Sequence, residues 1–404
     1  MFAPTRQPRH LFTLACLLAS LCLLAASTSA QPAVVIDDEE TRDGRRLPVL
    51  SRTKLLERAA TPETFDGEQR LRWVWHYTHE SEVAYLRLHV FAECHKPGDT
   101  WELIIYDGAN RVADRLTALS FAGLPAGTGV WTKIIRGRAA RVELQSETKP
   151  AGLRVRIDRL NFFHGEPQPK AITTGSDDMK DLARNYRPPH RYYNYGRAVA
   201  ALFFLNAEDQ SEANCTGFLV APDLLLTNHH CISQPWQLRS AEVRFGWETD
   251  GQPESVAISE IVLPDGALDF SLLRLEREVT AWPVAKLGAG AVAVRRGQPL
   301  VAIQHPSASL KLISVKDCKV EREQARGEGT ELTDFYHLCD TGTGSSGAPV
   351  LDESDGTVVG LHHLGDYSRD GRWGRNRAVR IDLVLDSIRR HDENLYKRIV
   401  TPSP

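Results

Sequence analysis

Short segments with strand-like alternation fill most of this sequence, and they limit its fold more than any other feature. In residues 70–164, and again in residues 198–364, apolar and polar side chains alternate in short runs that Gly, Pro, Asn and Asp interrupt. Helical periodicity appears only near the end, in Asp382–Val400. We therefore expect an all-β chain that ends in a C-terminal helix, and we exclude alternating strand–helix units.

The strand-like runs fall into two groups, which predicts two domains because 404 residues exceed one ordinary hydrophobic core. We expect a β-sandwich accessory domain at residues 66–165 and a second β-domain at residues 195–404. Residues 166–194 are rich in proline and charge and are interpreted as a linker. The motifs "IIYDGAN" and "RVELQS…GLRVRID" of the first domain resemble those of CUB or jelly-roll accessory modules.

The start of the chain has the pattern of an export signal. Basic residues precede an apolar run, Leu11–Ala26, and the small residues Thr28-Ser29-Ala30 follow it. The apolar run is shorter than the ~20 residues that a membrane-spanning helix needs. We expect a signal peptide at residues 1–30 and a charged propeptide or flexible arm at residues 31–65. The mature protein is then secreted or periplasmic, with no membrane insertion after signal removal.

Export places the cysteines in an oxidising compartment. Once the signal is removed, four of the remaining cysteines allow three different pairings. The neighbour pairing joins Cys215 to Cys231 and Cys318 to Cys339, and each such bond would stabilise the fold by ~3 kcal/mol in the chain-entropy picture. Cys94 is left over and is interpreted as a buried thiol.

Composition and charge narrow the possible partners. The formal net charge is -3, and Lys and Arg are scattered rather than concentrated, so we expect no nucleic-acid partner. A hydrophobic content of 42% with 25% charged residues is typical of a globular protein and excludes disordered and collagen-like classes.

The stretch "GSSGAP" offers a candidate nucleophile. A serine hydroxyl attacks a carbonyl at neutral pH only with a base within hydrogen-bond reach, a third group that fixes the tautomer of that base, and backbone N–H donors for the oxyanion. Glycine permits the tight backbone that such donors require. Gly344 and Gly347 stand on either side of Ser346, whereas Ser345 lacks this flanking pattern.

Three blocks, "TNHHC", "LDFSLL" and "GSSGAP", occur in that order along the chain. They resemble the signature blocks of the chymotrypsin-like serine peptidases, and most of all the bacterial branch of glutamyl and lysyl endopeptidases. The resemblance covers roughly residues 195–400. It implies His230 as general base, Asp269 as its orienting carboxylate and Ser346 as nucleophile, with the backbone N–H groups of Gly344 and Ser346 as oxyanion donors. It also implies two perpendicular six-stranded β-barrels, a protein or peptide substrate, and no cofactor.

Simpler roles compete for some of these residues. Neighbouring side chains of a strand point to opposite faces, so we interpret His229 as a packing or surface residue beside His230. Asp265 is a second carboxylate near Asp269, and we interpret it as part of the preceding turn. A zinc site is disfavoured because the spacing is not that of zinc ligands and one candidate is expected in a disulfide. Its ligands would have been His229, His230, His362, His363 and Cys231.

Two features of the sequence point to opposite substrate specificities. Asp340 lies six residues before Ser346, where the resemblance implies a carboxylate that receives Arg or Lys. Thr341 and His362 match instead the residues that hold an acidic side chain in glutamyl endopeptidases, provided that the imidazole is protonated or donates a hydrogen bond. Both alternatives stay open, and either predicts a charged P1 residue.

The sequence also allows predictions about where the substrate backbone binds and about activation. The residues after the two histidines of "GLHHLG", Leu364 and Gly365, are expected on a strand that pairs with the substrate backbone. Trypsin keeps an aspartate before its nucleophile to bind a newly formed N-terminus, whereas Ser345 stands there in this chain. We therefore expect that cleavage at Gly196-Arg197 does not activate the protein through that ion pair.

Three functions are consistent with the sequence. The first is a secreted serine endopeptidase with an accessory sandwich whose partner, a protein or a carbohydrate, is left open. The second is a catalytically silent secreted protein that binds peptide or carbohydrate on a serine-peptidase scaffold, which the intact triad disfavours. The third is an esterase with the same triad, which the strand pattern disfavours because esterases place their serine between a strand and a helix.

Overall fold

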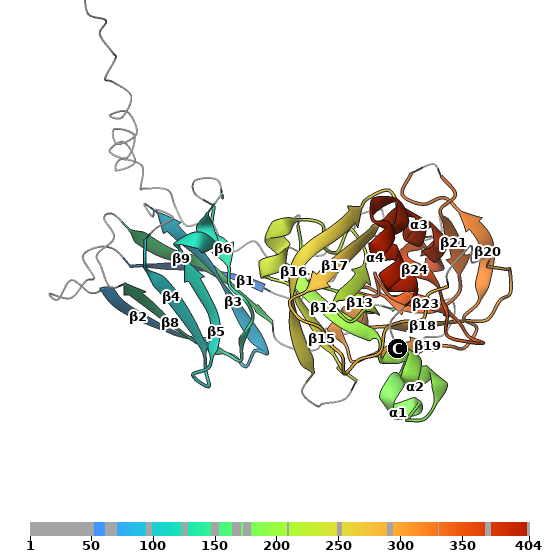
Figure 1. Cartoon of the computed structure of the whole chain (residues 1–404). Helices are drawn as coiled ribbons and strands as arrows, with labels where there is room; N and C mark the ends of the chain where they lie inside the picture. Colours follow the sequence, from blue (N-terminus) through green and yellow to red (C-terminus); the bar gives the residue numbers. More distant parts are fainter. Residues whose placement is uncertain are drawn as a thin grey trace, which may run out of the picture. The chain divides into compact units, whose positions relative to one another are not determined.

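A computed structural model of the chain describes residues 52–60, 71–93, 99–122, 124, 128–146, 153–163, 171–172, 179–207, 210–248, 253–288, 294–329, 331–367 and 373–401. The expected signal peptide, the leftover Cys94 and most of the expected arm lie outside these residues. The described part is mainly strand, and the expected all-β fold with a C-terminal helical segment is confirmed (Figure 1).

Alternating segments in the N-terminal half form two antiparallel sheets that share one core. One sheet has the strand order β1-β9-β3-β6, with β7 also on β3, and the other has the order β2-β8-β4-β5. Fully buried side chains of both sheets, such as Leu88 and Leu103, pack together. The strands are β1 (Arg52–Ala60), β2 (Leu71–Thr78), β3 (Tyr85–Glu93), β4 (Glu102–Asp107), β5 (Val112–Thr117), β6 (Val130–Trp131), β7 (Ile135–Arg136), β8 (Ala139–Ser146) and β9 (Arg154–Phe163), with the short 3-10 helix η3 (Ala118–Phe121) after β5.

The segment expected as a flexible arm contributes one of these strands. β1 pairs antiparallel with β9 at the edge of its sheet, from Arg52 opposite Phe162 to Ala60 opposite Val155. Its side chains face mostly outward, and Leu55 is 65% exposed. The strand is therefore held mainly by its ladder hydrogen bonds at a sheet edge, while its Leu56 packs against the core.

The next group of strands closes into a barrel with the order β12-β13-β14-β17-β16-β15. Every described side chain of β12 and β13 is buried, which fits the continuous apolar run of β12, whereas β13 also buries the polar side chains of Glu212, Asn214 and Thr216. The strands are β12 (Val199–Leu205), β13 (Glu212–Ala221), β14 (Leu224–Thr227), β15 (Glu242–Phe245), β16 (Glu254–Asp265) and β17 (Phe270–Leu275), with the 3-10 helix η4 (Pro235–Arg239) before β15.

The remaining strands form a second sheet with the order β11-β19-β18-β23-β24-β25-β21-β20. It departs from the six strands implied by the resemblance, since eight are present among the described residues and one of them, β11, comes from the linker. The strands are β11 (Lys180–Asp181), β18 (Leu300–Gln304), β19 (Leu312–Ser314), β20 (Val320–Ala325), β21 (Asp334–His337), β23 (Pro349–Asp352), β24 (Val358–Tyr367) and β25 (Trp373–Arg380), with the 3-10 helix η5 (Pro306–Ala308) after β18.

The predicted linker, residues 166–194, is built into the second barrel region. Its strand β10 (Ala171–Ile172) pairs with β22 (Thr341–Gly342), and β11 pairs with β19. The helices α1 (Leu182–Asn185) and α2 (Arg191–Gly196) follow. The Tyr192 hydroxyl donates to Glu353 Oε1 at 2.5 Å, and Lys311 Nζ donates to the Gly196 carbonyl at 2.7 Å. These contacts give structure to a segment that has no period of its own.

One helix was predicted over Asp382–Val400, and the structure has two, α3 (Ile381–His391) and α4 (Glu393–Val400). Asp392 separates them, because its side chain accepts hydrogen bonds from the backbone N–H groups of Asn394 and Leu395 and so caps the start of α4. No described helix is long and apolar enough to cross a membrane.

A buried ion pair joins the sandwich to the first barrel, which belong to one compact unit. Arg87 in β3 donates from Nε to Glu212 Oε2 at 2.7 Å and from a terminal nitrogen to Oε1 at 3.0 Å. The same guanidinium donates to the backbone carbonyls of Thr132 and Ser240. Both charged side chains are at most 1% exposed, so every one of these bonds is made out of contact with water.

Candidate active site

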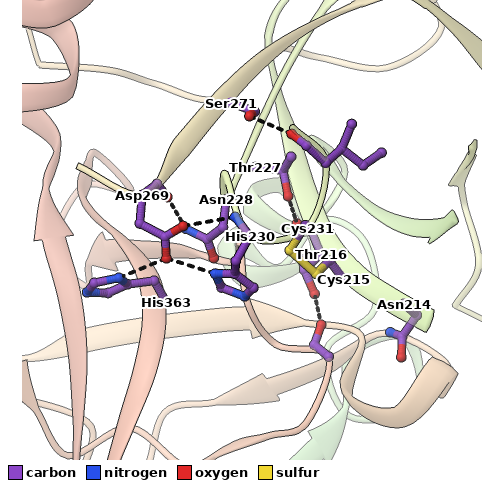
Figure 2. The surroundings of a disulfide bond; sticks show 12 residues. Asn214, Cys215, Thr216, Thr227, Asn228, His230, Cys231, Asp269, Ser271 and His363 are labelled. Carbon is purple, nitrogen blue, oxygen red and sulfur yellow. Dashed lines mark hydrogen bonds and ion pairs between the residues drawn. A yellow bond between two sulfur atoms is a disulfide. The ribbon is translucent and has the colours of Figure 1, made fainter. Parts of the chain in front are cut away.

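The candidate base lies on a turn that the barrel holds in place. β14 ends at Thr227, so His230 sits in the following turn rather than on a strand as expected. Asn228 donates from its side chain to the Asp269 carbonyl at 2.8 Å, and the Cys231 N–H donates to the Asn228 carbonyl. The disulfide Cys215–Cys231 ties the end of this turn to β13 (Figure 2). Covalent and hydrogen bonds together fix the place of His230.

His230 and Asp269 form a close pair at two points (Figure 2). His230 Nδ1 lies 2.8 Å from Asp269 Oδ2, and the His230 backbone N–H donates to Oδ1 at 3.0 Å. Burial alone would raise the pKa of the Asp269 carboxyl, but the His230 charge and the hydrogen bonds from His230 and His363 hold it well below its usual range. The carboxyl of Asp269 is therefore ionised at neutral pH.

The other ring nitrogen of His230 is turned to the interior of the site. With Nδ1–H donating to a carboxylate, Nε2 carries the lone pair and can accept a proton. Nε2 is buried and has no hydrogen-bond partner among the described residues. The ring is thus oriented to act as a base toward a group that approaches Nε2.

The two serines of "GSSGAP" differ in their surroundings. Ser345 is fully buried, and its hydroxyl accepts the Gly342 backbone N–H at 2.9 Å, while Ser346 is partly exposed. Gly344 and Gly347 have φ of +94° and +86°, a region that glycine enters at no steric cost. A Cβ on Gly347 would also lie 2.0 Å from the Thr216 carbonyl oxygen. The turn therefore requires both glycines and leaves Ser346 as the accessible hydroxyl.

Thr216 connects the Ser346 turn to the His230 turn. Its backbone N–H donates to the Ser346 carbonyl at 2.8 Å, and its hydroxyl donates to the Gly344 carbonyl at 3.0 Å. Thr216 directly follows Cys215, whose disulfide partner directly follows His230 (Figure 2). The two turns are thus tied to adjacent residues in the middle of β13.

The specificity candidates are buried: His362 lies in β24, Thr341 begins β22, and Asp340 directly precedes it. Asp340 is 4% exposed, and its backbone carbonyl accepts hydrogen bonds from the side chains of Gln304 and Ser314, both at 2.7 Å. The Thr341 hydroxyl donates to Asn376 Oδ1 at 2.9 Å. Both residues are therefore fixed in the loop that leads to Ser346.

His362 contacts a second histidine that sequence analysis did not consider. Its Nδ1 lies 3.2 Å from His337 Nε2. Burial lowers the pKa of His337 to about 3, and burial together with the neighbouring histidines lowers the pKa of His362 well below its usual range. His362 is therefore neutral, so of the two ways considered for holding an anion, only donation from a neutral ring is compatible with this environment.

Leu364 and Gly365 lie where one side of β24 loses its partner strand. The register of β23 on β24 ends with Pro349 opposite Leu361. Beyond that point Leu364 and Gly365 pair, within the described register, on the β25 side only. This leaves an extended backbone edge that a substrate strand can use.

His363, which the sequence suggested only as one ligand of a disfavoured zinc site, is a functional candidate in a different role. Its ring reaches Asp269 Oδ2 at 3.1 Å and Asp334 Oδ2 at 2.7 Å (Figure 2). The signal was available: successive side chains of a strand alternate faces, so a pocket role for His362 places His363 on the face toward the triad. The same alternation was applied only to His229, which is half-buried beside Gly266.

The competing assignments also have a structural outcome. Asp265 accepts the backbone N–H groups of Ala267 and Leu268 at 3.0 and 3.1 Å, which is the bracing of a turn. The sulfurs of Cys215 and Cys231 are bonded to each other and offer no thiolate to a metal. The second disulfide, Cys318–Cys339, completes the neighbour pairing considered from the sequence.

An imidazole paired with a buried carboxylate is two parts of the arrangement of a hydrolytic triad, and the glycine-flanked Ser346, on a turn hydrogen-bonded to β13, is the candidate for the third. Residues 215–361 match the family model of the trypsin-like peptidase domain. Over these residues the chain is similar to trypsin-like peptidases, and its mainly β architecture with a closed barrel fits that similarity. The match includes the candidate triad residues and stops short of the accessory sandwich.

Relatives of this domain occur in longer proteins. The chain is 32% identical over 183 residues to the uncharacterized protein y4fB of Sinorhizobium fredii, which covers 41% of this chain and 27% of that protein. It is 30% identical over 219 residues to the secreted RxLR effector protein 73 of Plasmopara viticola, covering 47% and 52%. The Rv3671c protease from M. tuberculosis in its active form is 16% identical, covers 52% of this chain and 84% of its own, and has a TM-score of 0.38. The chain thus spans about half or less of the length of these curated relatives.

Proposed function

We propose that this protein is a secreted serine endopeptidase in which His230, Asp269 and Ser346 form the catalytic triad. The observation that carries the proposal is the His230–Asp269 pair, with Nδ1 at 2.8 Å from Oδ2 and Nε2 buried and unpartnered among the described residues. The glycine-flanked Ser346 turn is bonded to Thr216 of β13, next to the cysteine that ties the His230 turn to the same strand. The family match supports peptidase chemistry of this type.

The proposed mechanism follows from these positions. His230 Nε2 takes the Ser346 hydroxyl proton as the oxygen attacks the scissile carbonyl, and then gives it to the leaving amine, which leaves an acyl-enzyme. Water repeats the route in reverse. The backbone N–H groups of Gly344 and Ser346 stabilise the oxyanion, each by ~3 kcal/mol. Asp269 stays ionised, because its lowered pKa keeps it from accepting the proton.

The selected P1 residue is proposed to be charged. Asp340 would receive Arg or Lys, whereas Thr341 and a hydrogen bond from neutral His362 would receive Glu or Asp. Two peptides that differ only in Glu or Lys at P1 separate these alternatives. Lost cleavage of the Lys peptide in Asp340→Asn supports the first alternative, and lost cleavage of the Glu peptide in His362→Phe supports the second. Equal cleavage of both peptides and of an Ala peptide would exclude charge selection.

Location and activation belong to the same proposal. The export-type N-terminus and the disulfides in the catalytic domain favour a secreted or periplasmic protein. We propose that the uncut chain is active, because Ser345 has no charge with which to bind a new N-terminus. Full-length protein with Gly196-Arg197 made uncleavable should hydrolyse peptide at the normal rate. Activity that appears only after cleavage here, when the newly formed N-terminus carries a free amine, would contradict this.

Labelling by a fluorophosphonate probe tests the enzyme against the silent binding protein. The full chain should label, and Ser346→Ala should not. Ser345→Ala is the matched control, because it removes the neighbouring buried hydroxyl and should keep the label. An unlabelled, folded full chain would exclude the serine hydrolase. A labelled chain that cleaves ester substrates but no peptide would favour the esterase.

A further inference from the structure

His363 is a buried side chain with two acidic partners. It lies in β24, is 2% exposed, and reaches Asp269 Oδ2 at 3.1 Å with Nδ1 and Asp334 Oδ2 at 2.7 Å with Nε2. Carboxylate oxygens accept hydrogen bonds and do not donate them. Both ring nitrogens must therefore carry a proton, which makes His363 an imidazolium bridging two carboxylates.

The groups packed around His363 support that charge. Glu328, in the loop after β20, has Oε1 3.8 Å from Nδ1. Arg377 in β25 lies 4.0 Å from Asp334, and the nearby histidines are His230, His337 and His362. Three carboxylates thus outnumber the cations in the cluster. Burial alone would lower the pKa of His363, but the hydrogen bonds and charges of Asp269 and Asp334 raise it to about 9.

Both imidazoles act on one oxygen of the proposed catalytic aspartate (Figure 2). Asp269 Oδ2 lies 2.8 Å from His230 Nδ1 and 3.1 Å from His363 Nδ1, while Oδ1 accepts the His230 backbone N–H. Without His363, the described hydrogen bonds to the Asp269 carboxylate would all come from His230. With His363 present, the carboxylate that orients His230 is itself held by a second residue.

We propose that His363 is a positioning residue that holds Asp269 ionised and correctly oriented toward His230. The inference rests on the proposed triad. It predicts that His363 acts on the turnover step and on its pH dependence, since the hydrogen bonds of its ring go to Asp269 and Asp334 rather than to Ser346 or a specificity candidate. A role in stability alone would leave both of these unchanged in correctly folded protein.

The test compares peptide hydrolysis by full-length His363→Gln and His363→Phe with the unaltered chain. We expect kcat to fall by about 10-fold to 100-fold, as when a group that orients another is removed, with KM changed by less than about 3-fold. In His363→Gln the loss of a positive charge should move the acidic limb of kcat/KM upward by about 0.5–1 pH unit. The alkaline decline of kcat near pH 9, which we expect in the unaltered chain, should be absent.

His89→Gln is the matched control, because His89 is a buried histidine of the sandwich whose Nδ1 lies 2.8 Å from Asp158. It should leave kcat and both limbs unchanged. If the His363 variants do not fold, Asp334→Asn tests the same cluster, with the alkaline limb moved to lower pH. Unchanged kcat and pH limbs in folded variants would overturn the inference.

Two further outcomes distinguish the positioning role of His363 from a metal site and from a failure of the proposed function. Asp269, Glu328 and His363 offer ligand atoms within 4.8 Å of one another, so activity lost on dialysis against EDTA and restored by Zn²⁺ would replace the positioning role with a metal site. Hydrolysis that persists in Ser346→Ala would refute the proposed function itself. Hydrolysis lost in Ser346→Ala but unaffected in the His363 variants would refute only the inference.

Discussion

Raising the pH from 7 to 9 should cost the folded protein about 2 kcal/mol through His363 alone. The pKa of this ring rises from an ordinary 6.5 to about 9 in the fold. A group with a raised folded pKa stabilises the fold fully below its unfolded pKa, and that stability is lost as pH rises through the folded value. At about 1.4 kcal/mol per pKa unit, the full contribution is about 3 kcal/mol, of which less than about 0.5 kcal/mol remains at pH 9.

The perturbation is His363→Gln in a Ser346→Ala background, which prevents self-digestion. Urea unfolding followed by tryptophan fluorescence at pH 7, 8 and 9 gives the free energy of unfolding. The quantity to compare is the difference between the two proteins. Other titrating groups cancel in it, including buried Lys311, whose pKa burial lowers and whose contribution therefore changes with pH in the opposite direction.

The difference in unfolding free energy should shrink by about 2 kcal/mol between pH 7 and pH 9. Parallel curves, with a difference constant to within about 0.5 kcal/mol, would mean that His363 does not lose a proton in this window and that the bridging imidazolium is wrong. His89→Gln in the same background controls for the loss of a buried histidine and should show a constant difference.

Three other perturbations have defined outcomes. Removing one partner of the Arg87–Glu212 pair, by Arg87→Leu or Glu212→Leu, should lower the unfolding free energy by about 3–5 kcal/mol. The double variant should lose less than the two single variants together, because it leaves no buried charge unpaired. Additive losses in urea unfolding would contradict this. Gly347→Ala should abolish hydrolysis and lower the unfolding free energy by more than the roughly 1–2 kcal/mol that a positive φ costs a non-glycine residue. Gly297→Ala is the control and should cost only that amount, since Gly297 has a φ of +80° and an added Cβ would meet nothing within 4 Å. Equal losses of stability in the two variants would refute the steric argument. Replacing both cysteines of Cys318–Cys339 by serine should lower stability by about 3 kcal/mol, measured in the same way; an unchanged midpoint would show that the loop is fixed without the bond.

The parts of the fold that the sequence predicted are those whose signal is local. β2 coincides with "LRWVWHYT", and the buried strand β12 is apolar in every residue. The choice of Ser346 over Ser345 was also local, because it depended on glycines that the turn needs at positive φ. In these places the neighbouring residue types are sufficient to predict the backbone conformation.

The parts that were missed depend on partners distant in sequence. β1 is charged along its length and becomes a strand only by pairing with β9. The linker strands are two residues long and exist only against β19 and β22. The break at Asp392 was readable, since an aspartate ahead of a second helical turn is a common cap. His363 required knowing that Asp269 and Asp334 approach from other strands.

The pairing of β11 with β19 has a consequence for how this domain can be isolated. A fragment that begins at residue 195, where the sequence placed the domain boundary, would lack β11 and leave the outer backbone groups of Leu312 and Ile313 open. An open sheet edge is a template for adding strands from other molecules. Such a shortened product would tend to self-associate, whereas one that starts ahead of Met179 keeps its edge covered.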